Sequence, residues 1–169
     1  MVLVVMGVAG SGKTVVGASL ARALAWQFAD ADTFHSAANV EKMSHGKPLT
    51  DEDRWPWLES VAHAIDAWLS EGANGIMACS ALKQSYRDVL SRNHPEQIKV
   101  VYLKGSYQLF EDRLSHRQDH FMKSNMLKSQ FAALEEPADA IVVDAALPVD
   151  KIVALLAAYV SGRGGTATD

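Results

Sequence analysis

The residues with the clearest chemical purpose form one glycine-rich stretch near the start of the sequence. Gly7-Val8-Ala9-Gly10-Ser11-Gly12-Lys13-Thr14 fits the pattern G-x-x-x-x-G-K-[ST], the phosphate-binding P-loop. Glycines let the backbone approach a phosphate, and the loop N–H groups form an anion site with the N-terminus of the following helix. We expect Lys13 to reach the β- and γ-phosphates of a nucleoside triphosphate and the Thr14 hydroxyl to hold Mg²⁺.

Two carboxylates, Asp30 and Asp32, end a short predicted strand over residues 26–32. Alternation along an extended segment puts both on the same side. Phosphoryl transfer needs one acid to orient or deprotonate the acceptor hydroxyl and another to hold Mg²⁺ directly or through water. The alternative is a polar turn after a strand, where acidic residues are common.

Three cations farther along the chain are candidates for binding an anionic acceptor. Arg54 stands in the first turn of a predicted helix, where a cation opposes the helix dipole, and a guanidinium can grip a carboxylate with two hydrogen bonds. The alternative is a surface arginine paired with Asp51 or Glu52. Lys83 and Arg87 lie four residues apart and share a helix face, for which a solvated basic surface is the favoured interpretation.

A second basic group recurs at steps of three and four residues. Its members are Arg113, His116, Arg117, His120 and Lys123. On a continuous helix these groups would repel one another unless an anion approached. We expect a lid over residues 113–124 that closes on ATP, with Arg113 and Arg117 on the phosphates, Arg117 in catalysis and His120 toward the acceptor. A charged helix facing solvent is the alternative.

Apolar runs and helical periodicity predict the elements that position these residues. The expected strands are 2–6, 26–32, 76–79, 98–103 and 140–144, and the expected helices are 15–25, 36–45, 50–72, 82–92, 106–115, 125–135 and 149–160. Strands that are apolar throughout and alternate with helices indicate a doubly wound, parallel, five-stranded α/β sheet flanked by helices. Ligands of such sheets bind beyond the carboxyl ends of the strands.

The whole chain indicates a globular protein with one P-loop kinase domain at residues 1–161 and a flexible tail at 162–169. It has 169 residues, 49% hydrophobic and 21% charged, with a net charge of −4, which argues against nucleic acid as a partner. The single cysteine, Cys79, allows no internal disulfide and favours a cytoplasmic location. No apolar run approaches the ~20 residues of a membrane span, and the first strand leaves no room for a signal peptide.

Several motifs in sequence order give the chain a family resemblance. It resembles the P-loop gluconate kinases (gluconokinases), which are related to the shikimate and nucleoside monophosphate kinases and share the P-loop NTPase fold of the latter. The resemblance runs from Val2 to about Val160. It rests on the P-loop and on Asp30–His35, Asn39 with Glu41–Met43, Gly46–Leu49, Asp51–Arg54 with Pro56–Leu58, Cys79–Lys83 with Tyr86–Arg87, Leu103–Gly105, His120–Phe121, Met126–Leu127, Gln130–Phe131 and Glu136–Pro137.

The resemblance implies an ATP:D-gluconate 6-phosphotransferase that uses Mg²⁺, lies in the cytoplasm as a homodimer and carries a mobile lid. By position, Asp32 is the base or orienting group, and His35 also faces the sugar acid. Asp30 lies near Mg²⁺, Arg54 binds the gluconate carboxylate, and Lys83 lines the acceptor pocket. Ser36 stands where family members often have proline, and because serine is a good N-cap we expect only a local change.

Two other functions stay open at this stage. One is a related small-molecule kinase that acts on shikimate or a nucleotide, which a panel of acceptors would separate. The other is an ATP-binding sensor without turnover, which would keep Lys13 but have no need of Asp32, Arg54 and a basic lid together. The joint presence of these groups favours an enzyme.

Overall fold

The computed structural model describes residues 1–116 and 120–162, and its strands form one parallel sheet. The strand order is β2-β3-β1-β4-β5, and every neighbouring pair is parallel. The strands are β1 (Val2–Met6), β2 (Gln27–Asp30), β3 (Gly75–Ala78), β4 (Ile98–Lys104) and β5 (Ile141–Asp144). The predicted doubly wound α/β sheet is confirmed.

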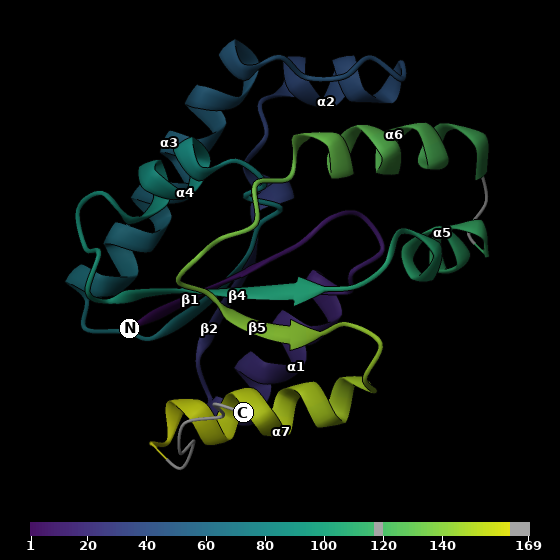
Figure 1. Cartoon of the computed structure of the whole chain (residues 1–169). Coiled ribbons are helices and arrows are strands. Elements are labelled where there is room, and N and C mark those ends of the chain that lie inside the picture. Colours follow the sequence, from purple (N-terminus) through teal and green to yellow (C-terminus); the bar gives the residue numbers. More distant parts are fainter. Residues whose placement is uncertain (117–119, 163–169) are drawn as a thin grey trace.

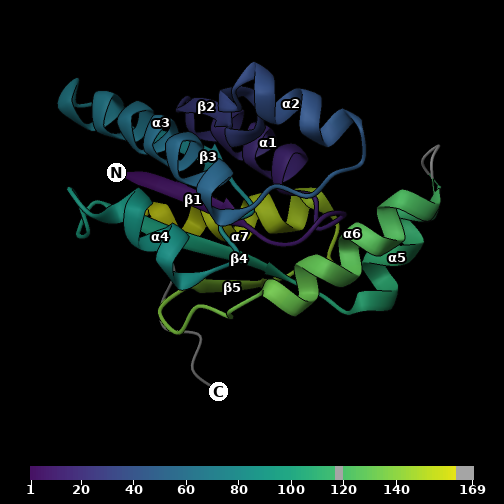
Figure 2. The same ribbon diagram turned by 90° about the horizontal axis from the view of Figure 1, so that it is seen from above.

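Helices cover both faces of the sheet and its carboxyl edge. They are α1 (Lys13–Leu24), α2 (Ala37–Ser44), α3 (Asp51–Ser70), α4 (Gln84–Ser91), α5 (Tyr107–Ser115), α6 (His120–Ala133) and α7 (Val149–Val160). Figure 1 shows α1 and α7 on one face and α3 with α4 on the other. Helices α5 and α6 pack side by side beyond the carboxyl end of β4 (Figure 2). No helix in the described residues has the length and apolar character that crossing a bilayer requires.

Strand β1 is the centre of the core because its unbroken apolar run suits a strand covered on both faces. Leu3 and Val5 pack toward α1 and α7, whereas Val2 and Val4 pack toward α3 and α4. All five residues of β1 are at most 1% exposed. The loop that follows Met6 therefore emerges from the central, fully buried strand of the sheet, at its carboxyl end.

The first turn of α3 is fixed by a capping box. The Thr50 hydroxyl accepts a hydrogen bond from the Asp53 N–H at 3.3 Å, and the Asp53 carboxylate accepts one from the Thr50 N–H at 2.8 Å. Apolar residues at helical spacing, Leu58, Val61 and Ile65, then bury one face of the helix against the sheet. The capped first turn carries Arg54, so the cap fixes the position of the Arg54 backbone.

Three of the differences between the predicted and observed element boundaries bear on the candidate site residues. The second strand ends at Asp30, and a 3₁₀ turn, η1 (Ala31–Phe34), follows it. The fourth helix begins at Gln84 because Lys83 is its extended N-cap residue. Helix α6 begins at His120 rather than near residue 125, so helical structure continues where the apolar pattern lapses.

Candidate active site

Of the three glycines with positive φ in the loop between β1 and α1, two lie well inside the left-handed region. Gly10 has φ +81° and Gly12, the N-cap of α1, has φ +94°. A Cβ on Gly10 would also lie 3.0 Å from the carbonyl oxygen of Phe110. Residues with side chains rarely adopt such backbone angles, so the geometry explains both glycines. This is the backbone expected of an anion-binding loop, and phosphate binding by Gly7–Thr14 stays a prediction.

Lys13 opens α1 and folds back over the loop. Its Nζ donates a hydrogen bond to the carbonyl oxygen of Val8 at 3.1 Å. Burial lowers the pKa of Lys13, and the nearby carboxylates, Asp32 foremost, act in the opposite direction. A partly dehydrated ammonium attracts an approaching phosphate more strongly than one in bulk water does.

Thr14 and Asp30 meet at the edge of the loop. The Thr14 hydroxyl donates to Asp30 Oδ2 at 2.6 Å, which brings together the two residues predicted to hold Mg²⁺. Hydroxyl and carboxylate oxygens are hard ligands that suit this ion, so the donor set fits. The prediction that Asp30 and Asp32 share one side of an extended segment is wrong. Asp32 lies in the 3₁₀ turn, and its N–H donates to Asp30 Oδ1 at 3.0 Å, because the Asp30 side chain caps that turn.

Asp32 keeps contact with solvent, yet surrounding protein atoms displace enough water to raise its pKa. The Asp30 carboxylate raises the pKa of Asp32 further, while Lys13 lowers it. His35 stacks on Trp57 with ring centroids 4.4 Å apart, and burial lowers the pKa of His35. The Trp57 indole N–H donates to the carbonyl oxygen of Ala31 at 2.7 Å, which ties the turn to α3. The structure therefore provides a carboxylate ready to accept a proton beside a neutral imidazole.

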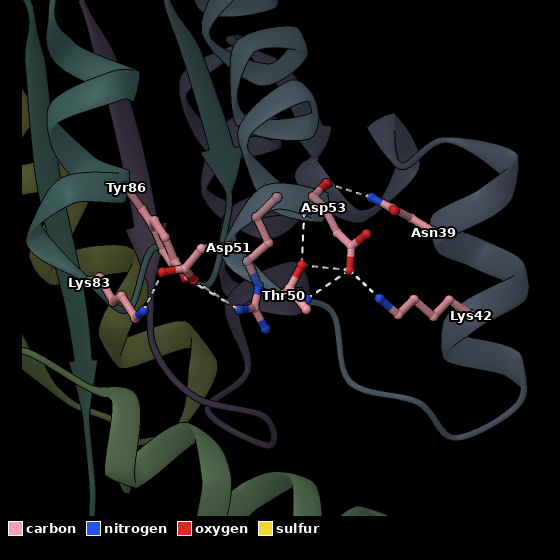
Figure 3. Close-up of polar contacts among 8 residues, drawn as sticks. Asn39, Lys42, Thr50, Asp51, Asp53, Lys83 and Tyr86 are labelled. Carbon is pink, nitrogen blue, oxygen red and sulfur yellow. Dashed lines mark hydrogen bonds and ion pairs between the residues drawn. The ribbon is translucent and has the colours of Figure 1, made fainter.

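Arg54 and Lys83 come together through Asp51. The carboxylate of Asp51 lies 2.7 Å from Lys83 Nζ and 3.5 Å from Arg54 Nη1. Arg54 Nη1 also donates to the Tyr86 hydroxyl at 3.3 Å. Arg54 thus does pair with Asp51, as the alternative interpretation held. The same cluster also contains Lys83, which was predicted to line the acceptor pocket. Helices α3 and α4 position this cluster through their first turns (Figure 3).

Arg87 does not share an exposed basic face with Lys83, and that prediction is wrong. Its side chain is 5% exposed and donates to the carbonyl oxygens of Ala81 and Leu82 at 2.8 and 3.0 Å. A third hydrogen bond goes to Gln84 Oε1. The guanidinium therefore holds the turn before α4, whereas Lys83 precedes that helix and stays half-exposed. Burial lowers the pKa of Arg87.

The base of the predicted lid contacts the glycine loop. Arg113 donates to the carbonyl oxygen of Gly10 at 3.4 Å and to that of Ala145 at 2.7 Å. Gln130 on α6 accepts a hydrogen bond from the Ala9 N–H at 2.6 Å. Arg117 lies outside the described residues. His120 begins α6, and its side chain also lies outside the description.

Sequence reasoning missed the polar partners that brace the acceptor side. Lys42 on α2 pairs with Asp53, and this contact, followed by the Thr50 N–H, lowers the pKa of Asp53 to about 2. The Asn39 amide donates to the carbonyl oxygen of Asp53 at 2.9 Å (Figure 3). The spacing of Thr50 and Asp53 signals the cap, but no local pattern links it to α2. Gln130 was likewise missed as a contact of the loop.

Comparison with known proteins places these residues in a family context. Residues 9–156 match the family model described as shikimate kinase. The thermoresistant gluconokinase of Escherichia coli K12 is 41% identical over 157 residues, covering 90% of this chain and 89% of that protein. The gluconokinase of Gluconobacter oxydans 621H is 47% identical over 137 residues, covering 81% and 76%. The crystal structure of a gluconokinase from Sinorhizobium meliloti 1021 superposes with a TM-score of 0.79 at 40% identity, covering 96% and 97%.

Proposed function

The chain belongs to the gluconokinases, within the wider family that the shikimate kinase model describes, and from this premise we propose that it phosphorylates D-gluconate. The reaction transfers the γ-phosphoryl group of ATP to the 6-hydroxyl, giving 6-phospho-D-gluconate and ADP. One observation carries the proposal. Lys13 folds over the glycine-rich loop, Thr14 at the edge of that loop binds Asp30, and Asp30 in turn binds the N–H of Asp32.

On the phosphate side, the residues position charge rather than form bonds. The loop N–H groups hold the β- and γ-phosphates, and Lys13 adds a cation where negative charge spreads during transfer. Thr14 and Asp30 would hold Mg²⁺, which neutralises phosphate charge when bound. Arg113 and Arg117 belong to the proposed lid at residues 113–124, whose closure would exclude water as a competing acceptor.

On the acceptor side, the proposal divides the work between a proton acceptor and a carboxylate clamp. Asp32 orients the 6-hydroxyl and takes its proton, and the neutral His35 hydrogen-bonds the sugar acid beside it. Arg54 and Lys83 bind the gluconate carboxylate, with His120 completing this side. A cytoplasmic homodimer is also part of the proposal, supported by the family resemblance.

We expect the rate to fall in acid as Asp32 takes up a proton. Because burial and Asp30 raise its pKa, the group titrates above the ordinary aspartate value of about 3.9. The ionised form is the base, so kcat/KM for D-gluconate should be full above this raised pKa and decrease as the pH falls through it. A pH profile of coupled ADP release measures this decrease of kcat/KM in acid. An acid decrease of the rate that is unchanged in Asp32→Asn would exclude Asp32 as its source.

We expect Arg54→Ala to raise the KM for D-gluconate by about tenfold to a hundredfold, because a charge-assisted contact with a carboxylate is lost. The matched acceptor is D-glucitol, which has the same carbon chain with a hydroxymethyl group in place of the carboxylate. We expect D-glucitol to be the weaker acceptor, and its KM should change little in the variant. The measurement is KM for both compounds with wild type and variant. Equal losses for both would remove Arg54 as the carboxylate clamp.

The direct test of the function is acceptor-dependent ADP release from Mg-ATP. D-gluconate is compared with shikimate and AMP at matched concentrations. We expect ADP release only with D-gluconate. ADP release with another acceptor would keep the kinase and change the assignment of its acceptor, and ATP binding without turnover would favour the sensor interpretation.

A further inference from the structure

Asp51, the first residue of α3, binds three side chains of the acceptor cluster. Oδ2 accepts a hydrogen bond from Lys83 at 2.7 Å, and Oδ1 accepts one from the Tyr86 hydroxyl (Figure 3). Oδ1 also lies 3.5 Å from Arg54 Nη1. Neither the P-loop nor the acid pair after β2 accounts for a carboxylate at this position. A negative charge held between two cations that are proposed to bind an anion needs an explanation.

The cluster is open to solutes, and its geometry is held from one side. The side chains of Asp51, Arg54 and Lys83 are between 31% and 37% exposed, so an acceptor can reach them. Beneath them the buried ring of Tyr86 lies 5.4 Å from Lys83 Nζ and 5.9 Å from the Arg54 guanidinium carbon. The aromatic face favours both cations and restricts their lateral movement.

The cluster of Asp51, Arg54 and Lys83 has a net charge of one positive unit. Arg54 and Lys83 contribute two, and Asp51 removes one. The neighbouring carboxylate of Asp53 is paired with Lys42 on the other side of the first turn of α3, so that pair is balanced by itself. His35, whose pKa Arg54 helps to lower, adds no charge near neutral pH.

We propose that Asp51 determines the charge of the acceptor that this site selects. With Asp51 present, Arg54 and Lys83 together match an acceptor that carries one carboxylate. A doubly charged sugar acid leaves one negative charge without a partner, and a neutral polyol leaves the extra cation unmatched. The inference rests on the proposed function, because it assigns selectivity within the acceptor site of that reaction.

A series of three six-carbon ligands isolates the effect of charge. D-glucitol, D-gluconate and D-glucarate share the configuration of their four inner carbons and carry no, one and two carboxylates. D-glucarate lacks the terminal hydroxyl and binds without reacting, so dissociation constants are measured by calorimetry in the presence of Mg-ADP. In wild type we expect D-gluconate to bind most tightly.

Asp51→Asn keeps the size of the side chain and removes its charge. We expect the preference for D-gluconate over D-glucarate to fall about tenfold, as expected for one unit charge gained near a partly hydrated carboxylate. Lys83→Gln should shift preference in the opposite sense, toward D-glucitol. The double variant Asp51→Asn with Lys83→Gln restores one net positive charge, so its D-gluconate to D-glucarate ratio should return toward wild type even if all three ligands bind more weakly.

Glu52→Gln is the matched control, because it removes a carboxylate from the same helical turn at an exposed position outside the cluster of Asp51, Arg54 and Lys83. Its ligand ratios should equal those of wild type. If Asp51→Asn weakens all three ligands by one factor, Asp51 only braces the two cations and the proposal is overturned. If that variant does not fold, an unchanged ratio in Lys83→Gln overturns it. Absence of D-gluconate-dependent ADP release would reject the proposed function instead, since the charge series is measured by binding alone.

Discussion

Replacement of Lys13 by alanine is expected to reduce kcat/KM by about a thousandfold or more. Removal of one preorganised donor to a transition state costs about a hundredfold to a thousandfold, and Lys13 supplies a full charge. Its Nζ already lies over the loop, 3.1 Å from the carbonyl oxygen of Val8, and burial has lowered its pKa. The measurement is coupled ADP release with D-gluconate and Mg-ATP.

The matched control is Lys151→Ala. Lys151 is exposed on α7, and this helix covers one face of the sheet away from the loop. This variant should keep wild-type turnover. Because the ammonium of Lys13 is held in a partly dehydrated position, its removal should not lower the melting temperature. Near-normal turnover of Lys13→Ala would exclude the loop from the mechanism, whereas a large drop in melting temperature would attribute the loss to unfolding.

Asp32→Asn is expected to lower kcat by about a hundredfold to ten-thousandfold with little change in ATP affinity. Asparagine keeps the shape of the side chain but cannot accept the proton of the attacking hydroxyl, and general base catalysis contributes about that range. Because its pKa is raised, Asp32 is also a stronger base than an ordinary aspartate. Steady-state kinetics and a binding titration with ATP separate the two quantities.

Asp144→Asn gives a comparison for this variant, because Asp144 also ends a strand at the same edge of the sheet, on the outermost strand β5. We expect it to have at most a small effect on kcat. If Asp32→Asn raises only the KM for D-gluconate, Asp32 binds the acceptor and is not its base.

The sheet and most of its helices were predictable because each rests on local signals. The apolar run of residues 2–6 predicts a buried strand, and the glycine pattern that follows predicts the loop. Thr50 with three acids predicts the start of α3, which the capping box confirms. Such patterns depend on neighbours within a few residues, so the sequence displays them directly.

The partners of individual side chains were harder to predict from the sequence, because they depend on contacts between distant segments. Helical spacing places Lys83 and Arg87 on one helix, but Lys83 is the extended residue before α4, and the carbonyl oxygens of Ala81 and Leu82 draw Arg87 inward. Gln130 meets the Ala9 N–H across 121 residues of sequence. Asp30 and Asp32 were found as a pair, yet their relation follows from a turn that strand alternation did not predict.

The central position of β1 has a consequence for how the chain assembles during synthesis. The strand at residues 2–6 leaves the ribosome before the rest of the sheet, and both of its neighbours, β3 and β4, are made about 70 or more residues later. A growing chain that ends before Ile98 therefore leaves one edge of an apolar strand unpaired and open to association with other chains. The P-loop, which follows β1, therefore lacks part of its supporting sheet until β4 has been added, although the loop itself is made well before that strand.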